Sequence, residues 1–195
     1  LAGAAPSQVR LGSTGPQAPG VELRLENINP DTRQGEIVAR TPSAMVGYFK
    51  NPEATKEVFT ADGWFRTGDL GELDKDGWLY IKGRLKNMIV GPGGENIYPK
   101  EIEEFLYTYP KVKDVQVIGV PDKRYGEEIM ACIVLRDGET ATEEEIKAYV
   151  ASSMARHKVP RYVDFVDSFP MNAAGKILKY KMREDAAKKF GLSEG

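Results

Sequence analysis

The sequence has little cysteine and little histidine: Cys132 and His157 are the only ones in 195 residues. A single cysteine cannot form an intramolecular disulfide, and the two residues together are too few donors for a cysteine/histidine zinc site. His157 stands between two basic residues and is interpreted as a surface residue, and Cys132 lies in an apolar segment and is interpreted as an inert core thiol. The shortage of cysteine favours a reducing compartment, and we expect a cytoplasmic protein.

Long hydrophobic runs and an excess of positive charge are also missing. No apolar run approaches the roughly 20 residues of a membrane-spanning helix, so we expect no membrane span. The start of the sequence has no basic segment followed by an apolar one, so no signal peptide is predicted. The formal net charge is −2, whereas proteins that neutralise nucleic-acid phosphates are usually basic, so we expect no nucleic-acid partner. The sequence begins at Leu1 rather than Met, and we expect it to be a piece of a longer protein.

The first part of the sequence predicts mostly β structure. Residues 1–20 are rich in glycine, proline and alanine and predict a loop. Alternating or β-rich segments predict strands over 21–26, 35–40, 65–67, 71–73 and 78–82. Between them, Asn51-Pro52-Glu53 has the N-cap, the first-position proline and the early acidic residue of a helix start.

The second part alternates helices and strands. Pro99 opens a predicted helix, and Thr142 and Glu145 form a capping box that opens another. Apolar or alternating runs predict strands over 115–120, 128–136 and 161–166, and a basic helix is expected over 178–190. The whole therefore predicts an α+β fold, with a β-rich first part and a small α+β domain after it.

Four local patterns could carry chemistry. Asp69 follows Thr-Gly, and an acceptor-only carboxylate suits two adjacent ribose hydroxyls. Arg84 follows a strand end, where a guanidinium can reach phosphate or ribose oxygens. The loop 91–96 has three glycines that allow close backbone approach to a ligand, and Gly175-Lys176 presents an amine on a flexible turn. Each has a simpler explanation, such as a turn cap for Asp69 or a surface ion pair for Arg84.

Together and in this order, the patterns resemble the AMP-forming acyl-CoA synthetases, the adenylate-forming ligase superfamily. GWFRTGDLG at Gly63–Gly71 resembles the ribose-binding motif, and GRLKNMIVGPGGENIYPKEIE at Gly83–Glu103 resembles the hinge and the loop after it. PMNAAGK at Pro170–Lys176 is similar to the motif that carries the catalytic lysine, and Lys158–Pro170 is similar to its usual lead-in. Gly35–Phe59 resembles a further family segment, so the resemblance covers nearly the whole chain.

The resemblance implies a domain organisation. Residues 1–82 would form the β-rich end of the large N-terminal adenylation domain, 83–87 the hinge, and 88–195 the small mobile C-terminal domain. Lys86 would be the hinge residue, although it could also be an ordinary exposed linker residue. The N-terminal domain of the same enzyme would be a partner, and no metal ligand is expected within this chain.

The resemblance also implies roles for individual residues. Lys176 would be the catalytic lysine of adenylation. Asp69 would bind the ribose hydroxyls of ATP or AMP, and Arg84 would contact ribose or phosphate oxygens. Gly93 or Gly94 would lie beside the pantetheine of CoA. Ala174 stands where the family often has threonine.

The implied activity joins a small-molecule carboxylate, expected to be a fatty acid, to CoA through an acyl-AMP. The cofactors would be ATP, CoA and Mg²⁺, with the magnesium site upstream of this chain. Because the family's phosphate-binding loop and acyl pocket would also lie upstream, the chain alone is expected to be inactive. Two alternatives stay open: an adenylation domain that loads a carrier protein, and a non-catalytic nucleotide-binding or interaction module.

Overall fold

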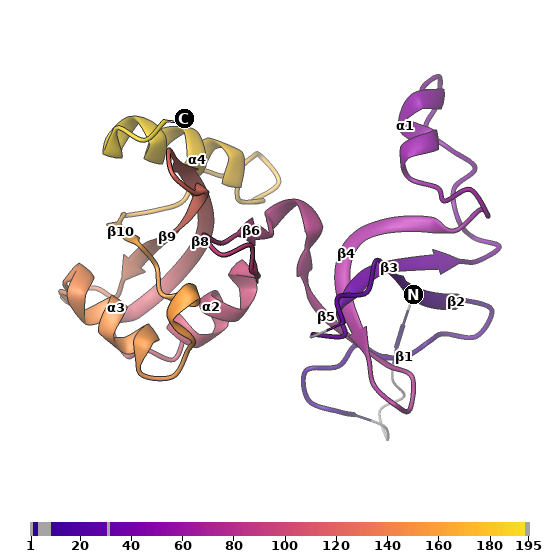
Figure 1. Ribbon diagram of the computed structural model, residues 1–195, viewed down its shortest axis with the longest axis horizontal. Coiled ribbons are helices and arrows are strands. Elements are labelled where there is room, and N and C mark those ends of the chain that lie inside the picture. The colour runs from indigo at the N-terminus through magenta and orange to yellow at the C-terminus, as the bar shows by residue number, and fades with distance from the viewer. Residues whose placement is uncertain (1, 4–8, 31, 194–195) are drawn as a thin grey trace. The chain divides into compact units, whose positions relative to one another are not determined.

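The computed structural model describes residues 2–3, 9–30 and 32–193. The chain divides into two units, Leu1–Lys86 (unit 1) and Asn87–Gly195 (unit 2). Each unit is built around its own sheet, drawn from indigo to magenta for unit 1 and from magenta to yellow for unit 2 (Figure 1). The structure is of mixed α+β character, which confirms the fold class predicted from the sequence.

The sheet of unit 1 has five antiparallel strands in the order β1-β5-β4-β3-β2. The strands are β1 (Gly15–Pro16), β2 (Glu22–Glu26), β3 (Gly35–Arg40), β4 (Phe65–Leu73) and β5 (Trp78–Arg84), and the helix α1 (Pro52–Glu57) lies between β3 and β4 in sequence. The loop predicted for residues 1–20 is wrong at β1, which pairs with β5. Residues 1 and 4–8 of that predicted loop lie outside the described residues.

Strand β4 is continuous, although the sequence predicts two separate strands there. Gly68 has a left-handed backbone with φ of 69°, and the pairing with β5 shifts register between Leu70 and Gly71. A side chain at Gly71 would start 2.7 Å from Cδ1 of Ile37, so glycine allows the two strands to approach. The glycines that suggest a break in the sequence therefore form a bulge, which bends β4 without ending it.

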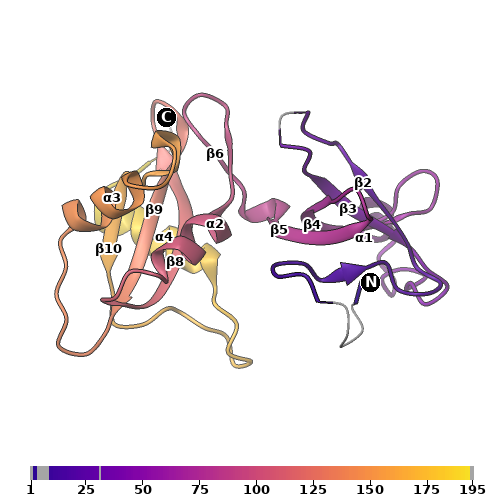
Figure 2. The same cartoon turned by 90° about the horizontal axis from the view of Figure 1, so that it is seen from below.

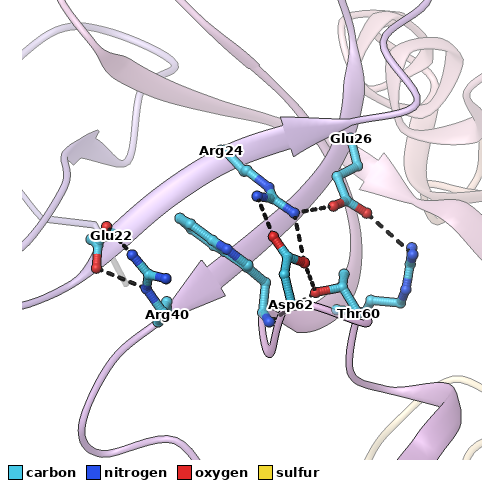
Figure 3. A network of polar contacts seen from close by, with 8 residues as sticks. Glu22, Arg24, Glu26, Arg40, Thr60 and Asp62 are labelled. Atoms are coloured by element: carbon cyan, nitrogen blue, oxygen red, sulfur yellow. Dashed lines mark hydrogen bonds and ion pairs between the residues drawn. The ribbon is translucent and has the colours of Figure 1, made fainter.

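Arginines and carboxylates of unit 1 form a network of polar contacts (Figure 3), and two of these arginines lie over the ring of Trp64. The guanidinium carbons of Arg24 and Arg40 lie 4.4 and 4.8 Å from the centre of the indole ring. Arg24 donates to both carboxylate oxygens of Asp62, at 2.9 and 3.2 Å, and the Thr60 hydroxyl donates to Asp62 at 2.6 Å. The hydrogen bonds from Arg24, followed by that from Thr60, lower the pKa of Asp62 from 3.8 to about 2.

The Asp62→Asn variant of this chain is expected to lose stability in a pH-dependent way. Because the pKa of Asp62 is lower in the folded chain, its ionised form stabilises the fold above the ordinary value of 3.8. That contribution disappears as the pH falls through about 2. Urea unfolding followed by tryptophan fluorescence should therefore show a difference between wild type and variant that shrinks over this range. A difference that stayed constant down to the lowest pH would contradict the assignment.

Unit 2 contains a three-stranded sheet in the order β10-β9-β8. Strand β9 (Gly126–Leu135) pairs antiparallel with β8 (Val112–Asp122) and parallel with β10 (Tyr162–Phe165), so β8 and β10 are the edges. The helices α2 (Pro99–Leu106) and α3 (Glu143–Ala151) cover one face, and α4 (Lys179–Phe190) covers the other (Figures 1 and 2). A small hairpin precedes α2, with β6 (Ile89–Val90) paired to β7 (Asn96–Ile97).

Two apolar clusters hold these layers together. The cluster beneath α2 and α3 includes Ile102, Leu106, Ile146 and Val150, all fully buried. The cluster beneath α4 includes Met182 and Ala186 of the helix and also Cys132 and Phe169. Side chains on one face of β8 and β9 belong to the first cluster, and side chains on the other face belong to the second. This division arises because successive side chains of a strand point to opposite faces. Among the residues that the structure describes, no helix has the length and apolar character needed to cross a bilayer.

Candidate functional site

The carboxylate of Asp69 and the guanidinium of Arg84 meet on unit 1. Asp69 of β4 lies opposite Arg84 of β5 in the strand register, and Nε of Arg84 lies 2.8 Å from Oδ1 of Asp69. The Asp69 side chain is 27% exposed and that of Arg84 is 55% exposed, so the pair faces solvent. Within the described part of the chain, Oδ2 of Asp69 accepts no hydrogen bond from protein. An acceptor oxygen and a cationic donor are therefore presented side by side, which suits a hydroxylated anion.

The backbone before Asp69 is fixed by the hydroxyl of Thr67. This hydroxyl donates to the carbonyl of Ile37 at 2.7 Å and accepts from the N–H of Asp69 at 3.1 Å. Gly68 stands between them with its left-handed φ, a conformation that other residues rarely adopt. Thr67 therefore ties the turn that carries Asp69 to the neighbouring strand β3. This role of Thr67 is not among those predicted from the sequence, although the combination of threonine, glycine and aspartate is typical of a side-chain-stabilised turn.

The glycine-rich loop lies in unit 2, between β6 and β7. The N–H of Gly91 donates to the carbonyl of Glu95 at 2.8 Å, and the N–H of Gly94 donates to the carbonyl of Gly91 at 2.9 Å. The Glu95 carboxylate accepts from the N–H of Gly93 at 2.9 Å. A Cβ on Gly93 would lie 2.5 Å from this carboxylate, whereas Gly94 has open space and a φ of 84°. The two candidate glycines thus differ, since a Cβ on Gly93 would meet only the movable end of the Glu95 side chain, whereas Gly94 has a backbone conformation that other residues rarely adopt.

Lys176 lies at the end of a tight turn in unit 2. The side-chain oxygen of Asn172 accepts from the N–H groups of Ala174 and Lys176, at 3.0 and 2.9 Å. Backbone bonds join Asn172 to Lys176 and to Gly175, and Met171 forms a bridge with Ile177. The Lys176 side chain is exposed, and its ammonium makes no ion pair or hydrogen bond within the described residues. A turn held by these hydrogen bonds thus exposes an unpaired amine to solvent.

Lys86 lies at the division between the two units, and Cys132 lies in an apolar cluster of unit 2. Lys86 is exposed in the 3-10 turn Leu85–Asn87, and the division between the two units falls directly after it. Cys132 is 4% exposed, and burial raises the pKa of its thiol to about 12, which makes it a poor nucleophile. In the described ranges no group of three or more histidine, cysteine, aspartate or glutamate residues could hold a metal ion.

Comparison with known proteins places these groups in a family. Residues 101–176 match the family described as the AMP-binding enzyme C-terminal domain, and the match ends on Lys176. The Bacillus subtilis protein YngI, named as an acyl-CoA synthetase, is 49% identical over 191 residues, which are 94% of this chain and 34% of YngI. The chain belongs to the adenylate-forming ligase superfamily.

Other members of the superfamily give the same assignment. The human mitochondrial medium-chain acyl-CoA ligase ACSF2 is 43% identical over 92% of this chain and 30% of its own length. The crystal structure of ATP-bound MatB from Rhodopseudomonas palustris superposes with a TM-score of 0.82 at 36% identity, covering 92% of this chain and 36% of MatB. The chain thus spans about a third of the length of the adenylate-forming relatives that it matches.

The structure brings together some of the candidate residues predicted from the sequence and separates others. Asp69 and Arg84 contact each other within unit 1. Lys176 and the loop with Gly93 and Gly94 both belong to unit 2 but lie in different segments of it.

Proposed function

We propose that this chain is the C-terminal part of an AMP-forming acyl-CoA synthetase. The observation that carries the proposal is the AMP-binding enzyme C-terminal domain match that ends on Lys176, where a braced turn exposes an unpaired amine. The Asp69–Arg84 pair on unit 1 supports it independently, because it offers an acceptor and a cation to one ligand. Residues 83–87 would be the hinge, with residues 1–82 as the end of the N-terminal domain and 88–195 as the mobile domain.

Unit 1 would hold the nucleotide. Asp69 accepts hydrogen bonds from the ribose hydroxyls, and its free Oδ2 is the first oxygen available to them. Arg84 donates to ribose or phosphate oxygens from the neighbouring strand while keeping the carboxylate in place through Oδ1. The Thr67 hydroxyl limits the rotation of this turn, so less freedom is lost when the nucleotide binds.

Lys176 would promote the first half-reaction. An oxygen of the substrate carboxylate attacks the α-phosphorus of ATP, the bond from that phosphorus to the bridging oxygen breaks, and pyrophosphate leaves. Negative charge from both reactants concentrates around the α-phosphate as the new bond forms. An ammonium placed there stabilises the transition state more than the separated reactants. Because nothing in the described chain pairs with its amine, Lys176 need not break an ion pair to do so.

The second half-reaction would use another face of unit 2. The thiol of CoA loses its proton to solvent, its sulfur attacks the acyl carbon of acyl-AMP, the bond from that carbon to the phosphate oxygen breaks, and AMP leaves. Rotation about Lys86 withdraws Lys176 and brings the loop with Gly93 and Gly94 to the pantetheine. A single mobile domain thereby completes two sites in turn.

The substrates follow from the proposed reaction. ATP and CoA are the cosubstrates, and we assign a fatty acid as the carboxylate, supported by the name of the relative ACSF2, a medium-chain acyl-CoA ligase. Magnesium would neutralise phosphate charge during adenylation. The described residues offer no cluster of ligands for it, so no step is assigned to the metal here.

The test is ATP–pyrophosphate exchange by the full-length protein that contains this chain. We expect exchange that depends on added octanoate and formation of octanoyl-CoA when CoA is supplied, with acetate and benzoate as comparison acids. The 195-residue chain alone is expected to give no exchange, because the phosphate-binding loop that the resemblance implies is not in its sequence.

The other outcomes separate the alternatives. Exchange without acyl-CoA formation would favour loading of a carrier protein. Nucleotide binding by the full-length protein without exchange with any acid would favour a non-catalytic module. Exchange by the 195-residue chain alone would contradict the proposal that adenylation also needs the part of the enzyme outside this chain, since Lys176 would then act without it.

A further inference from the structure

A partly buried ion pair lies at the open edge of the sheet in unit 2. Nζ of Lys179, the first residue of α4, donates to Oε1 of Glu103 in α2 at 2.7 Å. The same ammonium donates to the carbonyl of Val117 in β8 at 3.0 Å, and Glu103 accepts from the N–H of Val117 at 2.8 Å. The Lys179 and Glu103 side chains are only 22% and 13% exposed. One ion pair therefore joins two helices to one strand.

This pair replaces a missing neighbouring strand. Because β8 is an edge strand, the outward N–H and C=O of Val117 have no strand beside them. Val117 is fully buried, so unpaired backbone groups there would be costly. Glu103 accepts from the N–H and Lys179 donates to the C=O, which satisfies both groups. Removal of the lysine alone would leave the Glu103 carboxylate largely buried without its cation.

The pair also lies next to the turn that presents Lys176. The stem of that turn closes where the N–H of Leu178 donates to the carbonyl of Pro170 at 2.8 Å, one residue before Lys179. Inside the turn, the bonds of Asn172 fix its shape but do not attach it to the sheet. The stem of the turn is attached to the sheet by Phe169 and Ile177, which pack in the cluster under α4, and by Lys179.

We propose that Lys179, held by Glu103 and by the carbonyl of Val117, is a positioning residue that sets the direction in which the turn presents Lys176 during adenylation. The inference rests on the proposed function of Lys176. Its physical basis is that a displacement of about 1 Å in a group that stabilises a transition state can cost a large part of the rate. Lys179 itself contacts neither substrate nor nucleotide in this account.

The experiment compares four variants of the full-length enzyme: Lys179→Met, Lys179→Arg, Lys179→Met with Glu103→Gln, and Lys181→Met. Lys181 is the matched control because it lies on the same helix, is exposed and makes no ion pair within the described residues. The readouts are kcat and KM for ATP in pyrophosphate exchange, the rate of thioester formation from supplied acyl-AMP, and the thermal unfolding midpoint.

For Lys179→Met we expect kcat of exchange to fall about tenfold, with KM for ATP and the thioester-forming rate changed by less than about twofold. Lys179→Arg should keep most of the rate because a guanidinium can still donate to both oxygens. Lys181→Met should match wild type. The double variant no longer buries a lone carboxylate, so its unfolding midpoint should recover, while its exchange rate should stay low.

Three results would overturn the inference. They are a normal exchange rate in Lys179→Met, an equal loss of both half-reactions, and recovery of the exchange rate together with stability in the double variant. Lys176→Ala in the same assay tests the proposed function separately. If Lys176→Ala loses exchange while Lys179→Met keeps it, only the positioning role fails, and if Lys176→Ala keeps exchange, the proposed function fails.

Discussion

Replacement of Lys176 by alanine in the full-length enzyme is expected to lower the rate of acyl-AMP formation by about 10²–10³-fold, the usual cost of removing one donor that stabilises transition-state charge. The loss should be in kcat of ATP–pyrophosphate exchange, because the ammonium acts on charge that develops during the reaction. The turn itself should persist, since its bonds involve Asn172 and backbone atoms rather than the lysine side chain. Thioester formation from supplied acyl-AMP should stay close to the wild-type rate.

Two further variants make this result specific. Lys188→Ala removes another exposed lysine of unit 2 that makes no ion pair in the described residues, and should leave both half-reactions unchanged. Lys176→Arg keeps the charge but replaces a compact ammonium with a larger planar group, so an intermediate exchange rate is expected. An equal loss of both half-reactions in Lys176→Ala would show that the lysine supports the fold or the binding of both substrates instead.

Replacement of Lys86 by proline should separate the two half-reactions in another way. Proline fixes φ near −65°, within the range of a 3-10 turn, and it also disfavours the helical region for the preceding Leu85. A rotation between steps that changes φ at this position would be blocked. We expect one half-reaction to fall at least about tenfold while the other changes by less than about twofold, measured by exchange and by thioester formation from acyl-AMP.

Lys86→Ala is the matched control for the hinge. Alanine removes the same exposed side chain but leaves the backbone free to rotate, so both half-reactions should stay near wild type. If the proline variant retained both rates, the hinge would have to lie elsewhere in the chain. If alanine and proline had the same effect, the lysine side chain would be responsible and not the backbone.

Much of the local structure could be predicted because the determining residues are neighbours in sequence. The side chain of Asn51 accepts from the N–H of Ala54 at 3.0 Å, and Thr142 and Glu145 form both bonds of the capping box. The N-terminal ends of α1 and α3 are therefore encoded within a few residues. The exposed Lys176 could be located by its motif for the same reason.

The rest depended on contacts between distant segments. The short strand β1 is defined only by its pairing with β5, more than 60 residues away in sequence, and nothing in Gly15–Pro16 itself predicts a strand. Strand β4 is continuous because it pairs with β3 on one side and with β5 on the other. The bond between Lys179 and Glu103 spans 76 residues, so no local spacing could indicate it. Sequence patterns thus located the candidate site residues, whereas contacts between distant segments determine which of them are paired.

The central claim is that one mobile domain serves two half-reactions with different residues. The measurement that tests it most directly is the ratio of the single-turnover rate of thioester formation to that of adenylation, in wild type, Lys176→Ala and Lys86→Pro. The account predicts that Lys176→Ala raises this ratio about 10²–10³-fold and that Lys86→Pro shifts it by at least about tenfold. A ratio that stays the same in all three enzymes, with both rates lowered together, would contradict it.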